Sequence, residues 1–173
     1  LFRQGICPVD VALLNCSMPD ENGYVSFGVS ADLATSAAEC AKVRIAQINP
    51  QVPFSYGDPV IHVSKLDAAV LVDDPLVEVP TAVPTEKEIK IGEYIAEHIS
   101  DGATLQIGVG GIPNAVIRAL AGHKHLGLHT EAMTDGVLPL IQKGIIDNSL
   151  KKIEPGKSVA SLALGSRPLY DFM

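Results

Sequence analysis

Apolar segments of strand length alternate along this chain with segments of helical pattern, and this alternation limits the fold more than any other feature. The strand segments are apolar on both sides, which is typical of a parallel sheet covered by helices. The sequence therefore predicts an α/β fold with an open, mainly parallel sheet and helices on both faces. The predicted strands are Val9–Cys16, Lys42–Ile48, Val60–Val63, Ala68–Val72, Thr104–Val109, Leu126–Thr130 and Ser158–Leu164. The predicted helices are Asp32–Cys40, Thr85–Ser100, Pro113–Ala121 and Val137–Lys143.

The helix predicted over Thr85–Ser100 has the clearest signals, because Thr85 and Glu88 have the spacing of a capping box. A proline-rich link between Pro75 and Pro84 precedes it. This link is long enough to join two halves of one α/β unit, and its composition is not that of a flexible domain linker. We therefore expect residues 1–173 to form a single α/β domain.

Composition argues against several classes of protein. The chain has 13 Lys and Arg against 20 Asp and Glu, a net charge of −7, whereas a protein that binds nucleic-acid phosphates would present a basic face. No apolar run is long enough to cross a membrane as a helix. The three cysteines, at positions 7, 16 and 40, are too few and too scattered for a disulfide framework or a zinc site. We expect a cytoplasmic protein that binds no nucleic acid, membrane or metal.

A glycine-rich segment between a predicted strand and a predicted helix is the first candidate for a binding site. Gly108, Gly110 and Gly111 follow the strand, and Pro113 falls in the first turn of the helix, where its missing N–H is not needed. Glycines let a backbone approach a ligand closely, and the free N–H groups of the helix would face an anion or a carbonyl oxygen. The alternative is a tight turn that binds nothing.

A dinucleotide site is a second interpretation of the same segment. Gly108 and Gly110 match the first half of the fingerprint, and Glu131 lies at about the offset of an acid that binds a ribose. The third glycine of the fingerprint should stand at position 113, where the chain has Pro113. This mismatch weakens the dinucleotide interpretation.

Two segments that end consecutive predicted strands, Gly108–Asn114 and Thr130–Asp135, are expected to line one crevice, because ligands of open parallel sheets bind at the carboxyl ends of strands. The alternative is that Thr130 and Asp135 merely cap the helix predicted from Val137.

Histidines at positions 123, 125 and 129 resemble a metal-ligand cluster, but no cysteine or paired carboxylate completes it, which favours solvated turn histidines. No arrangement of Ser, His and Asp or of Cys and His indicates a nucleophile.

Several longer motifs together resemble the acetyl-CoA hydrolase/transferase family, which includes acetate, butyryl and 4-hydroxybutyrate CoA-transferases. The motifs occur in order over the whole chain and are Val9–Leu14, Met18–Asp32, Thr104–Val116, Leu128–Gly136 and Leu169–Phe172. The resemblance implies a CoA-transferase-like domain in an acyl-CoA:carboxylate CoA-transferase of the 4-hydroxybutyrate or acetate type. Such enzymes work through a glutamyl-CoA thioester, with coenzyme A as substrate and no separate cofactor. The alternatives are an acyl-CoA hydrolase of the same family and a non-catalytic module that binds CoA or a nucleotide.

The family's nucleophilic glutamate follows an Asn-Ser segment, and its second glycine signature is Gly-Gly-x-Gly-Gly-x-x-Asp-Phe. The glycine signature does not occur in this chain, whose one Asn-Ser pair is Asn148-Ser149. The resemblance therefore implies that the catalytic glutamate lies beyond Met173 and that this chain contributes no catalytic residue. We expect part of the amino-terminal domain of a longer two-domain enzyme, incomplete at both ends and inactive alone. Its expected partners are an acyl-CoA, a small carboxylate, the carboxyl-terminal domain and, as a further option, a second copy. The expected substrate-binding residues are Gly108, Gly110, Gly111, Ile112, Pro113, Asn114, Thr130 and Glu131.

Overall fold

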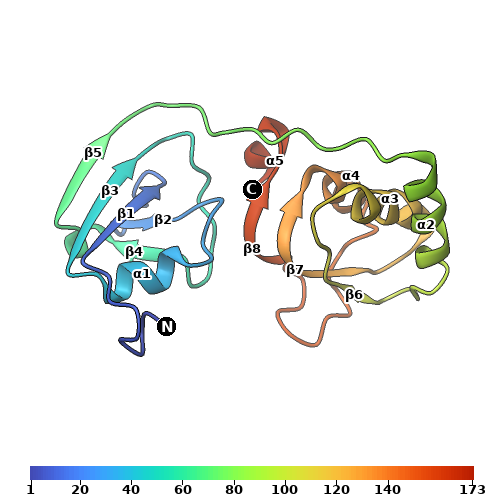
Figure 1. Ribbon diagram of the computed structural model, residues 1–173, viewed down its shortest axis with the longest axis horizontal. Coiled ribbons are helices and arrows are strands. Elements are labelled where there is room, and N and C mark those ends of the chain that lie inside the picture. The colour runs from blue at the N-terminus through green and yellow to red at the C-terminus, as the bar shows by residue number, and fades with distance from the viewer. The chain divides into compact units, whose positions relative to one another are not determined.

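The computed structural model describes all residues from Leu1 to Met173 and divides into two compact units, each with a parallel sheet of its own (Figure 1). The first unit comprises residues 1–77 and 170–173, and the second comprises residues 78–169. The division after Val77 falls inside the proline-rich link between Pro75 and Pro84. That a single domain includes both units stays a prediction.

The first unit contains a three-stranded parallel sheet and a short antiparallel pair. Its parallel sheet has the order β1-β3-β5, with β1 at Val11–Cys16, β3 at Val43–Ile48 and β5 at Ala68–Leu71. Strand β2 (Tyr24–Ser26) pairs antiparallel with β4 (Val60–His62). The helices are α1 (Ala34–Cys40) and the 3-10 turn η1 (Val63–Lys65).

In the β1-β3-β5 sheet, β1 has one buried and one exposed face, whereas β5 is exposed along its whole length. Along β1, Ala12, Leu14 and Cys16 are buried, whereas Leu13 between them is 78% exposed. Because neighbouring side chains of a strand point to opposite faces, this alternation assigns the two faces. The register sets exposed Leu13 beside exposed Ile45, so the uncovered face is apolar.

The second unit contains a parallel sheet of order β6-β7-β8 with its helices. The strands are β6 (Thr104–Leu105), β7 (Gly127–Thr134) and β8 (Val159–Leu164). The helices are α2 (Glu86–Ala96), α3 (Gly111–Ala119), η2 (Leu120–Gly122), η3 (Asp135–Val137) and α4 (Leu138–Gln142), and α5 spans Arg167–Phe172 across the boundary of the units.

Helices α2 and α3 pack closely because a glycine lies at their contact. A Cβ added to Gly92 of α2 would lie 2.7 Å from the carbonyl carbon of Ala115 in α3 and 2.8 Å from its Cβ. Gly92 and Ala115 are both buried. The small residues therefore allow the backbones to approach at this point.

The α/β class and the predominance of parallel pairing are confirmed, and the parallel strands divide between two sheets. Strand β2 was not predicted. Strand β6 ends at Leu105 and not at Val109, whereas β7 continues beyond Thr130 to Thr134. The capping box is confirmed: the Thr85 side chain accepts from the backbone N–H of Glu88, and the Glu88 side chain accepts from that of Thr85. No helix has the length and apolar character needed to cross a membrane.

Candidate functional site

Loops from three strands meet at one edge of the sheet in the second unit, which we call the carboxyl edge. Because β6, β7 and β8 are parallel, their carboxyl ends lie at the same edge. Residues 106–110 follow β6, Asp135 follows β7, and Gly165 and Ser166 follow β8. In open α/β sheets ligands bind at such an edge. The carboxyl edge is therefore the candidate site.

A buried hydroxyl joins the glycine-rich loop to the central strand. The backbone N–H of Ile107 donates to Oγ1 of Thr130 at 2.9 Å, and the Thr130 hydroxyl donates to the Ile107 carbonyl oxygen at 2.7 Å. Thr130 is only 5% exposed. β6 ends at Leu105, and after it the Thr130 side chain, in place of the β7 backbone, bonds to the backbone of Ile107. Thr130 thus contacts the residue directly before the predicted segment Gly108–Asn114, and a crevice shared by the two predicted segments stays a prediction.

The glycine-rich loop opens helix α3 as predicted. Gly110, with φ of 141°, precedes the helix, and the Asn114 N–H donates to its carbonyl oxygen at 3.1 Å. Pro113 lies in the first turn of α3. A Cβ added to Gly108 would meet no atom within 4 Å, so the loop has open space at this residue. Ile112, four positions later, is 39% exposed.

The first residue of α3 lies against a carboxylate. A Cβ added to Gly111 would overlap Oε1 and the carboxyl carbon of Glu88, which belongs to the capping box of α2. The Thr85 backbone N–H donates to Glu88 Oε2 at 2.7 Å, and the Thr85 hydroxyl donates to it at 2.8 Å. These bonds, the backbone one first, hold the pKa of the Glu88 carboxyl below its ordinary value. The group is therefore an anion at neutral pH.

An extended segment of the chain itself crosses the carboxyl edge. The Val79 N–H donates to the Gly165 carbonyl oxygen at 2.9 Å, after β8. Asn114, near the start of α3, donates from its Nδ2 to the Ala82 carbonyl oxygen at 3.3 Å. Asn114 is 7% exposed, so its amide holds this segment from within the unit. The predicted site residue Asn114 thus has an observed structural partner.

Asp135 ties the same segment to the ends of two strands. Its Oδ2 accepts from the Thr81 hydroxyl at 2.9 Å, and its Oδ1 accepts from the N–H and the hydroxyl of Ser166 at 2.9 and 3.0 Å. A Cβ on Gly165 would overlap this carboxylate. The interpretation of Asp135 as a cap of the helix predicted from Val137 is wrong, because the N-cap of α4 is Val137 and no side-chain cap bond is present.

Glu131 lies in the middle of β7 and not after its end. Thr130 and Ala132 are buried, whereas His129 and Glu131 are exposed. By the alternation of a strand, Glu131 therefore lies on the face opposite Thr130. This position does not match that of a ribose-binding acid, which follows its strand, so the dinucleotide interpretation loses its second support.

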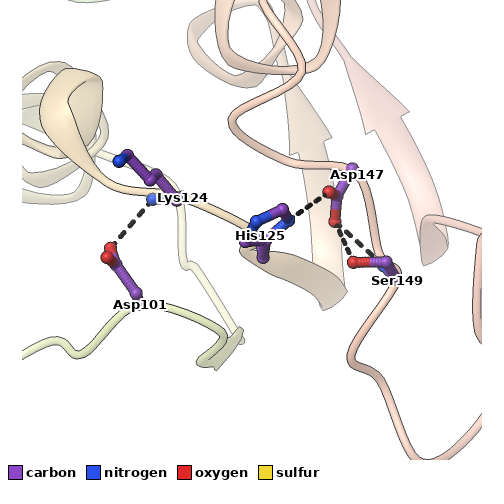
Figure 2. A network of polar contacts seen from close by, with 5 residues as sticks. All are labelled: Asp101, Lys124, His125, Asp147 and Ser149. Carbon is purple, nitrogen blue, oxygen red and sulfur yellow. Dashed lines mark hydrogen bonds and ion pairs between the residues drawn. The ribbon is translucent and has the colours of Figure 1, made fainter.

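A second polar network precedes β7, at the opposite end of the strand from the carboxyl edge (Figure 2). His125 Nδ1 contacts Asp147 Oδ2 at 2.7 Å, and Asp147 Oδ1 accepts from the N–H and the hydroxyl of Ser149 at 2.9 and 2.8 Å. The Ser149 N–H, then the His125 ring and the Ser149 hydroxyl, lower the pKa of Asp147 to about 2. In the same view the backbone N–H of Lys124 donates to Asp101 Oδ1 at 2.9 Å. These groups hold a turn together.

The histidines and cysteines do not gather into one site: His123 and His125 have separate partners, His129 and Cys7 are exposed, and Cys16 is buried. His123 Nε2 contacts the Ile99 carbonyl oxygen at 2.9 Å. No group of three or more His, Cys, Asp or Glu side chains is arranged to hold a metal ion. Cys16 is fully buried, which raises the pKa of its thiol to about 12 and keeps it from acting as a thiolate nucleophile at neutral pH.

Sequence reasoning missed Glu88, Thr81 and Ser166 as parts of the carboxyl edge. Glu88 had a local signal, the capping box, but nothing in the sequence linked it to Gly111. Thr81 and Ser166 meet Asp135 across 54 and 31 positions of the chain. Contacts of this separation leave no periodic signal in a single sequence.

Known proteins resemble both the sequence and this structure. Residues 1–84 match the family model described as the acetyl-CoA hydrolase/transferase N-terminal domain. Over 173 residues, all of this chain, the sequence is 46% identical to 4-hydroxybutyrate coenzyme A transferase of Clostridium kluyveri. The resemblance to the acetyl-CoA hydrolase/transferase family is confirmed. A CoA transferase of Fasciola hepatica, named for succinyl-CoA:acetate and propanoyl-CoA:succinate transfer, is 44% identical over 174 residues.

A solved structure supports the same relationship. The crystal structure of 4-hydroxybutyrate CoA-transferase from Porphyromonas gingivalis superposes with a TM-score of 0.94 and 53% sequence identity, over 99% of this chain and 44% of that chain. The chain spans 40% of the length of the Clostridium enzyme and 36% of that of the Fasciola enzyme. The structural resemblance to this CoA-transferase thus extends over 99% of the chain.

Proposed function

We propose that the protein containing this chain is an acyl-CoA:carboxylate CoA-transferase of the 4-hydroxybutyrate or acetate type. The observation that carries this proposal is the 46% identity, over the whole chain, to a protein named 4-hydroxybutyrate coenzyme A transferase. Coenzyme A enters as part of the substrate, and we propose no resident cofactor. A cytoplasmic location fits such substrates.

The proposed reaction proceeds in two half-reactions through a covalent glutamyl-CoA thioester. In the first, CoA passes from the acyl group to the glutamyl carboxyl, and the donor carboxylate leaves. In the second, CoA passes to the acceptor carboxylate, and the glutamate is regenerated. Covalent catalysis of this kind divides one difficult exchange into two easier steps. We propose that the glutamate lies outside residues 1–173, because the family's second glycine signature, Gly-Gly-x-Gly-Gly-x-x-Asp-Phe, does not occur in this chain.

The part of this chain in the reaction is substrate binding, through the glycine-rich loop at the carboxyl edge and two residues of β7. We propose that the residues are Gly108, Gly110, Gly111, Ile112, Pro113, Asn114, Thr130 and Glu131. The open space at Gly108 and the contact of Thr130 with Ile107 support the assignment of the loop and its neighbour. Glu131 is kept among the proposed substrate-binding residues because it is an exposed acid of β7, on the face opposite Thr130.

The test compares the 173-residue chain with the longer gene product. Each is incubated with acetyl-CoA and labelled 4-hydroxybutyrate, butyrate, succinate or acetate, and transfer of label into CoA ester is measured. We expect exchange by the longer protein and none by the 173-residue chain. Exchange by the shorter chain would show that the nucleophile lies inside it. Release of free CoA without an acceptor would instead favour the acyl-CoA hydrolase.

A loop variant tests the proposed site. In the longer gene product, Gly108→Leu adds a side chain where a Cβ meets no atom of residues 1–173 within 4 Å, so we expect it to raise the KM for the CoA ester while the melting temperature is unchanged. Gly122→Leu is the matched control, because a Cβ there also meets no atom within 4 Å and Gly122 lies outside the proposed set. Equal KM values for the two variants would argue against this site.

A further inference from the structure

The start of α3 has the features expected of an anion site, but a carboxylate of the same chain lies there. Helix residues Gly111 and Ile112 have no intrahelical acceptor for their N–H groups, since the first N–H groups of a helix have none. The partial positive charge of a helix N-terminus favours a negative group nearby. In this structure the half-buried Glu88 carboxylate lies directly against Gly111.

We propose that Glu88 is the intramolecular anion of the α3 N-terminus and that it excludes phosphate and carboxylate groups of ligands from the glycine-rich loop.

The two oxygens of Glu88 have different surroundings. Oε2 accepts both hydrogen bonds from Thr85, at 2.7 and 2.8 Å, which fixes the carboxylate as part of the α2 capping box. Oε1 is the atom nearest to where a Cβ of Gly111 would be. The absence of a side chain at Gly111 therefore makes room for the carboxylate. One charge serves the N-termini of two helices, because Glu88 is also in the first turn of α2.

A second anion at this position would face a like charge at short range. Like charges a few ångströms apart repel even in water, and more strongly where water is partly excluded. An uncharged carbonyl or amide oxygen would meet no such penalty and could still accept from the loop N–H groups. The loop is thus suited to the neutral part of a ligand.

Together with the proposed function, the exclusion of anions by Glu88 indicates which parts of an acyl-CoA bind beside the glycine-rich loop and which bind elsewhere. The amide and thioester carbonyl groups fit beside Gly110 and Gly111, whereas the phosphate groups must bind away from the α3 N-terminus. The exclusion of anions rests on Glu88 alone. Only the identity of the neutral ligand rests on the proposed function.

The experiment is a titration of the 15N-labelled 173-residue chain with inorganic phosphate, followed by the amide signals of Gly110, Gly111 and Ile112. Glu88→Gln removes the charge and keeps the capping box, which accepts Gln as well as Glu. Glu86→Gln is the matched control, since Glu86 is also an acid in the first turn of α2 and is exposed. Glu88→Ala is a second charge-removing variant, which separates the loss of charge from an effect of the new amide.

We expect both Glu88 variants to bind phosphate at these amides at least about fivefold more tightly than the unaltered chain. The Glu86 variant should match the unaltered chain. Equally tight phosphate binding by the unaltered chain and by Glu88→Gln, or no binding gained by either Glu88 variant, would overturn the proposal.

A parallel titration of the unaltered chain with acetyl-CoA separates this proposal from the proposed function. Shifts of the same three amides with acetyl-CoA, but not with phosphate, would support a neutral group in the loop. No shift with acetyl-CoA, while Glu88→Gln still gains phosphate binding, would count against the proposed substrate and leave the role of Glu88 standing.

Discussion

The Thr130 hydroxyl bonds to both backbone groups of Ile107, accepting from the N–H at 2.9 Å and donating to the carbonyl oxygen at 2.7 Å. One side chain thereby satisfies two backbone groups that a longer β6 would have paired with β7. The glycine-rich loop begins one residue later, at Gly108. The position of the loop therefore depends on a hydroxyl of the neighbouring strand.

Replacement of Thr130 by valine should destabilise the second unit. Valine has nearly the same shape but cannot bond to Ile107, so two backbone groups lose their partner in a buried setting at a cost of about 2 kcal/mol. Urea unfolding and amide exchange at Ile107 measure the loss. Thr104→Val is the control, because Thr104 is exposed on β6. Equal stability of the two variants would contradict a structural role for the Thr130 hydroxyl.

Gly92→Ala should destabilise the packing of α2 on α3, although this change in an exposed helix gains about 1 kcal/mol. The new Cβ would lie within 2.7 Å of the Ala115 backbone, so the helices must move apart. We expect a loss of about 1–3 kcal/mol in urea unfolding. Gly122→Ala is the control, because a Cβ added to Gly122 would meet no atom within 4 Å. A more stable Gly92→Ala variant would show that the helix contact is looser than described.

The Asp147 network should make the second unit sensitive to acid. The folded pKa of Asp147 is about 2 against an ordinary value of 3.8, so between these values the unfolded chain binds more protons than the folded chain. Stability is therefore fully present above about pH 4 and is lost as the pH falls towards 2. Urea midpoints measured from pH 2 to 5 should show this slope, and Asp147→Asn should flatten it. An unchanged slope in Asp147→Asn would assign the acid sensitivity to other carboxyls.

Adjacent residues of β1 should respond in opposite ways to a charge. Leu13 is 78% exposed and Leu14 is 5% exposed, so Leu13→Lys should leave the fold intact and Leu14→Lys should unfold the first unit. Leu13→Lys should also reduce self-association at high protein concentration, since it breaks an exposed apolar face. Circular dichroism and light scattering measure the two effects. Unfolding by Leu13→Lys would mean that this face is covered in solution.

Local signals in the sequence were sufficient for several elements. The capping box at Thr85 and Glu88 marked the start of α2 correctly, and the apolar run before Ser17 marked β1. The turn at Gly110 and the helix after it followed from glycine and proline chemistry. These features depend on residues within a few positions of one another, which a single sequence records directly.

The remaining features depend on contacts between distant residues. The length of β6 was overestimated because the apolar run continues to Val109, whereas Thr130 replaces the ladder from Ile107 on. The carboxylate beside Gly111 and the segment that crosses the carboxyl edge are tertiary contacts of Glu88 and Ala82. No periodicity encodes such pairs. The expectation that Gly108–Asn114 and Thr130–Asp135 line one crevice stays a prediction; it rests on the topology of parallel strands, which places the carboxyl ends of β6 and β7 at one edge.

The bonds of Asp135 have a consequence for the order of folding. Asp135 meets Thr81 and Ser166 only after segments 54 and 31 positions away have come into place. Contacts of long sequence separation pay the entropy of loop closure before they add stability, so they tend to form after local ones. The capping of α2 and the turn at Gly110 can form early, whereas the carboxyl edge is completed late. We therefore expect the carboxyl edge, the region proposed for ligand binding, to reach its native order after the local structure beside it, so that a newly made chain gains its binding surface late in folding.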